Sequence, residues 1–424
     1  VMCYAEFASM IPVAGSAYTF TYTTVGEIVA WVIGWDLILE MLMAGSVVSK
    51  YWGVYLNQFF ELIGWNINTN IAIGSFNFDL APVIIVAFFT ALLVMGTKIG
   101  ARVDGALTIL KIAIVVFIVV VGFFYIKAEN FTPFIPPSEP AASTDGSGVS
   151  AVMEQPLWQW ATGMAPSIYG VTGIISGAAL VFFAFLGFDV VATASEETIN
   201  PKKNVPLGIG VGLGLIIVLY TLVAIVTTGM VSYKDLAKQS DPSLAVAFKM
   251  VGADWAAKII SLGIVIGMAT VVMVLLLGLT RVVFAMSRDG LLPRGLSHTG
   301  KHGTPVRLQI IVGVVMALIA ACCNVGILSD MVNIGTLSAF TLVAISIPIM
   351  RKKRPDLERS FKIPGNPWVP ILIALANLWL MVNLSVLTWI RFVVWLIVGF
   401  AIYFGYGYRH ARLGAGELEV AAQE

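Results

Sequence analysis

Ten runs of apolar residues constrain the fold of this chain more than any other feature. Each is long enough to cross a bilayer as a helix, for which about 20 residues suffice. Charged residues make up only 12% of the sequence, whereas soluble domains usually contain about 25%. Backbone groups in lipid must be hydrogen-bonded internally, which favours helices. We therefore expect an all-α polytopic membrane protein with spans near 28–54, 79–99, 103–126, 173–198, 206–231, 256–286, 306–327, 329–350, 368–388 and 390–409, after a helix remnant at 1–11.

The distribution of basic residues predicts the orientation. Loops on one side carry seventeen Lys and Arg residues, and loops on the other side carry six. Because cytoplasmic loops are enriched in Lys and Arg, we place the first set, the connection at 12–27 and the C-terminal tail at 410–424 in the cytoplasm, with the protein in the plasma membrane. The Pro-, Ser- and Gly-rich stretch 127–172 is then an extracellular loop. Residues 1–409 form a single transmembrane domain.

The run at 173–198 stops resembling an ordinary membrane helix partway along, in the stretch FFAFLGFDVVATASEET that begins at Phe182. Glycine and Asp189 appear where apolar residues should continue. A helix that is interrupted at membrane depth must face protein or a water-filled cavity. Unwinding around Leu186 and Gly187 would direct carbonyls of one half-helix and amides of the other at the same place. Such a pair of ends suits an amino acid zwitterion; the alternative is a glycine-kinked helix packed against its neighbours.

Few charged side chains lie within the apolar runs, and such residues are usually functional. Asp36 and Glu40 are one helical turn apart on one face of the first full span, with Glu40 near its middle. Lys111 stands in the span at 103–126. For Lys111 the alternative is that its long side chain reaches the membrane interface. A glutamate side chain is too short for that, so Glu40 should face the protein interior.

Other features exclude several classes of function. The cysteines and histidines show no metal-ligand spacing, so we expect no metal, disulfide framework or cofactor; they are Cys3, Cys322, Cys323, His298, His302 and His410. No catalytic constellation argues for an enzyme. The net charge of +1 gives no field for nucleic acid. The glycines of GIGVGLG at 208–214 lie inside a span without a preceding strand, which favours close helix packing over a dinucleotide site.

Five stretches together resemble the amino acid-polyamine-organocation superfamily, in particular its cationic amino acid transporter branch and bacterial-type permeases. They are CYAEFASMIPVAGSAYTFTY from Cys3, GWDLILE from Gly34, FFAFLGFD from Phe182, ASEETINPKKNVPLGI from Ala194 and TRVVFAMSRDGLLPR from Thr280. The resemblance implies two inverted five-helix repeats with discontinuous helices, plus two peripheral C-terminal helices. The run at 173–198 would be the sixth helix. Members carry a further helix before the one in which this sequence begins, so we expect an N-terminally truncated chain.

The resemblance also implies site residues. The substrate ammonium would bind the carbonyls of Phe183, Ala184 and Leu186, with Gly187 allowing the turn and Phe188 acting as an aromatic lid. Glu40 would face the side-chain end of the pocket. Lys111 falls where proton-coupled members place a lysine.

The sequence thus predicts a secondary active transporter that takes up cationic or broad-range L-amino acids with protons, by alternating access. Its partners would be the amino acid, protons and the lipid bilayer. Two alternatives stay open, namely an amino acid exchanger and a homologue that acts only as a sensor or partner subunit.

Overall fold

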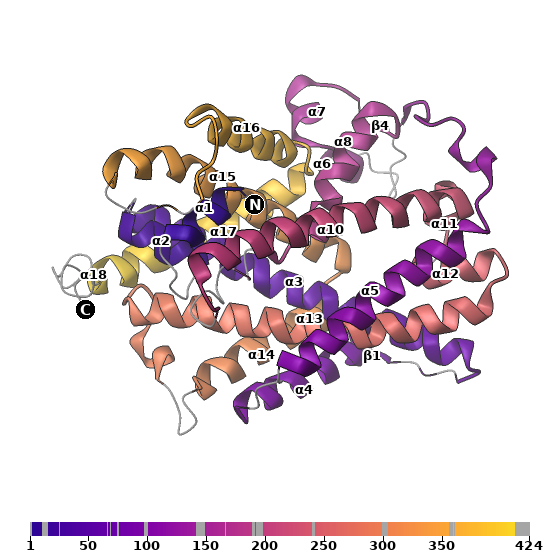
Figure 1. Ribbon diagram of the computed structural model, residues 1–424, viewed down its shortest axis with the longest axis horizontal. Helices are drawn as coiled ribbons and strands as arrows, with labels where there is room; N and C mark the ends of the chain where they lie inside the picture. The colour runs from indigo at the N-terminus through magenta and orange to yellow at the C-terminus, as the bar shows by residue number, and fades with distance from the viewer. Residues whose placement is uncertain are drawn as a thin grey trace.

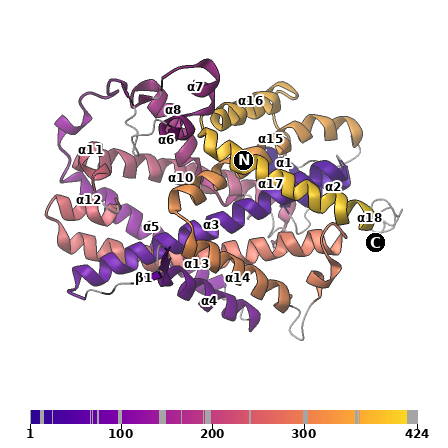
Figure 2. The same ribbon diagram turned by 180° about the vertical axis from the view of Figure 1, so that it is seen from behind.

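The computed structural model describes residues 2–10, 16–24, 26–65, 67, 69–73, 76–96, 101–140, 149–165, 167–188, 191, 198–239, 242–298, 304–355, 359 and 361–411. The architecture is all-α (Figures 1 and 2). Each predicted run contains one apolar helix, and these are α3 (Glu27–Leu62), α4 (Leu80–Val94), α5 (Ala101–Phe123), α8 (Gly170–Val181), α10 (Pro201–Met230), α13 (Asp254–Arg288), α14 (Val306–Cys322), α15 (Val325–Lys353), α16 (Trp368–Val382) and α17 (Val386–Ile402). Within the described residues, six helices are long and apolar enough to cross a membrane. The protein is therefore a polytopic membrane protein.

Shorter elements lie between and beside these helices. The short α-helices are α1 (Met2–Met10), α2 (Ser16–Thr24), α6 (Val149–Glu154), α7 (Leu157–Thr162), α11 (Tyr233–Ala237), α12 (Leu244–Met250) and α18 (Tyr408–His410). The 3₁₀ turns are η1 (Ala128–Phe131), η2 (Phe182–Phe185) and η4 (Arg294–Ser297), and η5 (Tyr403–Gly407) is a π-helical segment. Two antiparallel pairs join β1 (Asn70–Ile73) to β2 (Phe76–Asp79) and β3 (Glu139–Pro140) to β4 (Ser167–Ile168). The connection expected at 12–27 thus contains a helix, α2.

Side-chain caps set several helix starts. The side chain of Asp79 accepts a hydrogen bond from the backbone N–H of Ala81 at the start of α4. Asn324 caps α15, and Ser385 caps α17. A cap of this kind satisfies an N–H that the first helical turn leaves without a partner. Asn324 and Ser385 lie within predicted apolar runs. These polar side chains therefore divide the apolar sequence into separate helices.

Helix α3 forms the centre of the packed structure. It packs against α13 and α15, while α4 and α14 pack against it and each other. In Figure 1, α5 and α10 lie in front of it, and Figure 2 shows α14 and α17 on the opposite face. A second group consists of α1 and α5, both packed against α10. α5 and α10 expose many large apolar side chains, as expected of helices that face lipid.

Candidate functional site

The helix that contains the predicted break ends where the sequence indicated. Regular α-helix stops at Val181, a 3₁₀ turn covers Phe182–Phe185, and Leu186 is extended with φ −68° and ψ 150°. Gly187 follows with φ 112°, a conformation that L-residues rarely adopt. A Cβ at Gly187 would meet no heavy atom within 4 Å, so glycine is favoured there by its backbone conformation. Asp189 lies outside the described residues, as does most of the segment that the sequence predicts to form the second half-helix.

An asparagine of another helix caps the end of α8. The Asn333 amide Nδ2, on α15, donates to the Leu180 carbonyl at 2.9 Å. Asn333 is completely buried, and its Oδ1 has no hydrogen-bond partner within the described part of the chain. One of the last carbonyls of α8 is thereby satisfied from outside the helix. The Phe183 carbonyl accepts the Leu186 N–H at 3.2 Å and keeps a second lone pair.

An aromatic cavity adjoins the break. Its volume is about 220 Å³, and the residues that line it are Cys3, Tyr4, Phe182, Phe185, Phe188, Leu213, Phe340, Val343, Ile373 and Asn377. Tyr4 and Phe188 both pack against Phe340, with ring centroids 5.2 and 5.0 Å apart, and Tyr4 also lies edge-on to Phe188. Such distances fall within the range of favourable aromatic pairs. Phe188, the predicted lid, is therefore one ring of a cluster contributed by α1, the break and α15.

The remaining predicted residues of the break face different surroundings. Phe183 and Leu186 pack against a cluster formed by Ala44, Leu275 and Val332 of α3, α13 and α15. Ala184 is exposed. The side chains at the break thus divide between the aromatic cavity and the helices around α3.

Glu40, on α3, does not line the aromatic cavity. It is completely buried, as is Asp36. Ala44, one helical turn beyond Glu40, belongs to the cluster that Phe183 and Leu186 pack against. Ser338 of α15 is a polar neighbour of Asp36. Asp36 thus lies at the contact between α3 and α15, and Glu40 is one helical turn further along α3.

Lys111 is half-buried at the contact between α5 and α13. Its aliphatic stem packs on Gly267, where an added Cβ would lie 3.2 Å from the lysine Cγ. Leu275, eight residues further along α13, packs with the break residues Phe183 and Leu186. Eight residues of helix span about 12 Å. Lys111 is therefore connected to the break through α13 and lies outside the cavity.

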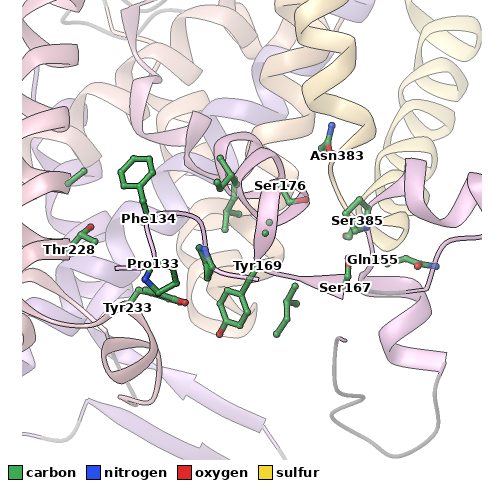
Figure 3. Close-up of a pocket in the computed structure, with 18 of the residues that line it drawn as sticks. Pro133, Phe134, Gln155, Ser167, Tyr169, Ser176, Thr228, Tyr233, Asn383 and Ser385 are labelled. Atoms are coloured by element: carbon green, nitrogen blue, oxygen red, sulfur yellow. The ribbon is translucent and has the colours of Figure 1, made fainter. Parts of the chain in front are cut away.

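A larger cavity, of about 1000 Å³, opens at the end of the molecule that carries residues 127–172 (Figure 3). Tyr169, Ser176 and Leu180 contribute to it from α8 and the residue before that helix. Because Leu180 lies in the last turn of α8, this cavity extends to within one turn of η2. Sequence patterns gave no signal for it, since its walls come from six separate segments.

The segment with Lys234 contacts the segment with Glu139 and Tyr169 at the rim of this cavity. Lys234 donates to Glu139 at 2.9 Å and lies 5.1 Å from the centroid of the Tyr169 ring. The hydrogen bond to Glu139 raises the pKa of Lys234. Both side chains of this pair are close to half exposed, so the contact is weak in water.

Comparison with known proteins gives the family. A sequence profile described as amino acid permease matches residues 1–405. The branched-chain amino acid permease BcaP of Bacillus subtilis is 41% identical and the methylthioribose transporter of the same organism is 40% identical; each alignment covers 97% of this chain and 83% of the relative. The Arabidopsis thaliana cationic amino acid transporter 3, mitochondrial, is 35% identical over 84% of this chain and 55% of its own length. These relatives are transporters and not enzymes. The chain belongs to the amino acid permease family of the amino acid-polyamine-organocation superfamily.

Proposed function

We propose that the protein is a secondary active transporter that carries amino acids by alternating access, with the substrate bound at residues 182–188. The interrupted helix beside an aromatic cavity is the observation that supports this proposal most strongly. Interrupted helices offer backbone groups to ammonium and carboxylate groups at membrane depth. The 1000 Å³ cavity, which reaches Leu180 in the last turn of α8, supplies an approach from the side of 127–172.

For the substrate side chain we propose a broad range in which apolar side chains are favoured. No acidic residue of the described chain lines the 220 Å³ cavity beside Phe188, and apolar walls favour apolar groups. A relative with 41% identity is named for branched-chain amino acids. Cationic substrates are the second candidate, because Glu40 is fully buried one turn from Ala44 and other relatives are named cationic amino acid transporters.

Proton coupling is the next part of the proposal, and it is assigned to Lys111. A charged lysine between α5 and α13 would hold these helices in one arrangement, and loss of its proton would release them. Linkage then requires that proton and substrate affect each other's binding equally. Obligatory amino acid exchange is the alternative mechanism. We place the protein in the plasma membrane with its C-terminus in the cytoplasm, because seventeen of the loop Lys and Arg residues lie on that side and six on the other.

Flux through the purified, reconstituted protein tests this proposal. We expect labelled leucine to accumulate in proteoliposomes when an inward proton gradient is imposed, without amino acid inside. Uptake only into vesicles that are preloaded with amino acid would show exchange, and binding without flux would show a sensor.

A pair of phenylalanine variants connects the flux to the site. Phe188→Ala removes a ring from the cavity and should weaken leucine binding about tenfold, or ~1.4 kcal/mol. Phe124→Ala removes an 80% exposed ring on the outer surface and should leave binding unchanged. Equal effects of the two variants would contradict the assignment of the cavity.

A further inference from the structure

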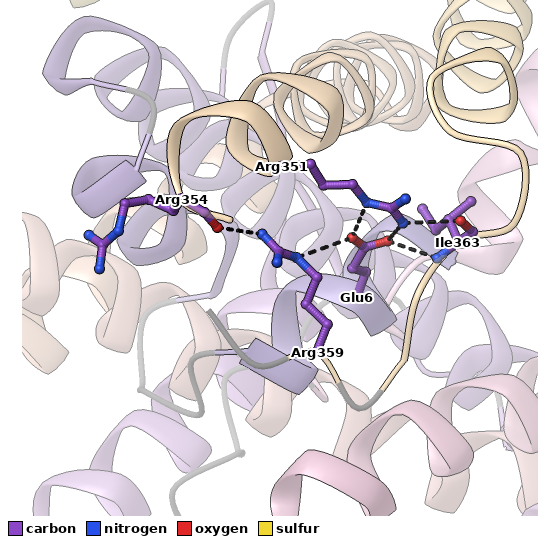
Figure 4. Close-up of polar contacts among 5 residues, drawn as sticks. All are labelled: Glu6, Arg351, Arg354, Arg359 and Ile363. Carbon is purple, nitrogen blue, oxygen red and sulfur yellow. Dashed lines mark hydrogen bonds and ion pairs between the residues drawn. The ribbon is translucent and has the colours of Figure 1, made fainter. Parts of the chain in front are cut away.

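A buried carboxylate joins the start of the chain to the end of α15 (Figure 4). Glu6 of α1 has no solvent exposure. Arg351 binds it with two hydrogen bonds, from Nε to Oε1 at 2.8 Å and from Nη2 to Oε2 at 2.6 Å. The backbone N–H of Ile363 donates to Oε2 at 2.8 Å, and the Arg359 Nε lies 3.8 Å from Oε1. The carboxylate is thus surrounded by two guanidinium groups and a backbone amide.

The arginines also donate hydrogen bonds to backbone carbonyls of the connection that follows α15. The Arg351 Nη2 donates to the Ile363 carbonyl at 3.0 Å, and the Arg359 Nη2 donates to the Arg354 carbonyl at 2.7 Å. Arg351 is in the last turn of α15. Glu6 therefore joins α1, the end of α15, Arg359 and Ile363. We call Glu6, Arg351 and Arg359 the arginine latch.

The arginine latch lies one helical turn from the aromatic cavity. Cys3 and Tyr4 of α1 line that cavity. Cys3 and Glu6 are three residues apart and therefore lie on the same face of the helix. The proposed transport site uses neither Glu6 nor the arginines, so their arrangement requires a separate explanation.

The two ends of the molecule carry ion pairs of different strength. Near the 1000 Å³ cavity the connections meet through Lys234 and Glu139, whose side chains are 45% and 44% exposed. In the arginine latch the carboxylate is fully buried and paired with Arg351 in bidentate geometry, which is the strong form of this interaction. Exposed pairs are screened by water and salt, whereas buried pairs are screened much less. The 1000 Å³ cavity thus lies at the end with 127–172, and the arginine latch joins α1 to α15 at the other end.

The two helices that the arginine latch joins differ in their main packing partners. α1 packs mainly against α10, whereas α15 packs mainly against α3 and α16. Any opening at this end that separates α1 from α15 must break the bonds between Glu6 and Arg351. Water entering the gap would hydrate the separated charges, which offsets the lost pairing and makes the opening reversible.

We propose that the arginine latch is the inner closure of the transporter, and that it must open before the substrate leaves on the side of residues 351–363. This inference rests on the proposed function of alternating access. Glu6 acts as a positioning residue, because it touches no part of the cavity and sets which end of the cavity is open.

Cys3 supplies a native reporter. It is 4% exposed and lines the cavity, and the sequence contains only three cysteines. Cys322 is exposed and Cys323 half-buried, so Cys322→Ser and Cys323→Ser leave one thiol. The rate at which a charged, membrane-impermeant maleimide modifies Cys3 in nanodiscs measures how often water reaches the cavity.

In this background, Glu6→Gln should speed modification of Cys3 about tenfold, as expected for a conformational bias within the usual 5- to 150-fold range. Arg359→Gln should act in the same direction, and it retains the bidentate pair of Glu6 and Arg351, so it serves if Glu6→Gln does not fold. Tyr403→Phe removes a part-buried hydrogen bond to Glu27 elsewhere and controls for lost stability. It should leave the modification rate unchanged.

The results separate the arginine latch from the proposed function. If the folded Glu6→Gln and Arg359→Gln variants label no faster than the parent, the latch proposal is wrong, even if the protein transports leucine. Faster labelling in Tyr403→Phe as well would also overturn it, because general loosening would explain the effect. If the latch variants alone label faster while the parent neither binds nor transports leucine, the arginine latch controls access to the aromatic cavity but the proposed function, and with it the role in substrate release, fails.

Discussion

Replacing Gly187 by alanine isolates the contribution of the backbone at the break. A Cβ there meets no atom within 4 Å, so steric overlap contributes nothing. The φ of 112° costs an L-residue about 1–3 kcal/mol. In the free variant this strain is relieved when the break relaxes toward another conformation. The substrate must then restore the original one, so binding should weaken by about 5- to 150-fold.

Gly177 offers a matched control within α8. A Cβ at Gly177 also meets nothing within 4 Å, and the residue lies inside the helix. Alanine there should stabilise the helix by about 0.5–1 kcal/mol and leave the affinity for leucine unchanged. Isothermal titration of leucine into both purified variants, after size-exclusion chromatography confirms that each is folded, measures the difference. If Gly187→Ala binds leucine as tightly as the parent protein, the break does not need this backbone conformation and the reasoning fails.

Three further substitutions probe residues around the break. Glu40→Gln should weaken lysine binding and spare leucine if the carboxylate pairs with cationic substrates, and equal loss of both in a competition assay would indicate a structural role. Lys111→Ala should abolish the pH dependence of leucine affinity, because proton and substrate binding are linked through this residue in the proposed mechanism; continued proton-driven accumulation would exclude Lys111 as the coupling residue. Gly313→Val should lower thermal stability by about 1–3 kcal/mol, because its side chain meets Thr90 of α4; an unchanged melting temperature would show that the α4–α14 contact adapts.

The membrane helices were predictable because length and apolarity identify them directly. Several boundaries were less predictable, and α3, for example, continues to Leu62 instead of ending near 54. The apolar pattern predicts one span that ends at 388 and another that begins at 390, whereas α17 begins at Val386 after its cap Ser385. Similarly, α15 begins at Val325 after Asn324 instead of at 329. Ser and Asn are helix-capping residues, so these two side chains carried the missing signal.

The surroundings of the break were not predictable from sequence patterns. Glycine at 187 indicated the interruption through local backbone chemistry. The cap by Asn333 and the rings of Tyr4 and Phe340 come from distant helices, and one sequence carries no signal for such pairings. Glu6 is a similar case, since its partner Arg351 is 345 residues away. The burial of Glu6 could not be predicted, because the short apolar segment around it contains no basic residue to pair with its charge.

Photochemical labelling tests most directly whether an amino acid binds at the break. Photo-leucine, whose side chain carries a diazirine, is irradiated with the reconstituted protein, and the modified peptides are identified by mass spectrometry with and without excess leucine. We expect label on the residues around the aromatic cavity, namely Tyr4, Phe188 and Phe340, and we expect excess leucine to suppress it. If excess leucine suppresses labelling only near Phe134 and Tyr233 in the 1000 Å³ cavity, and none of these three rings is labelled, the site proposed for this transporter is wrong.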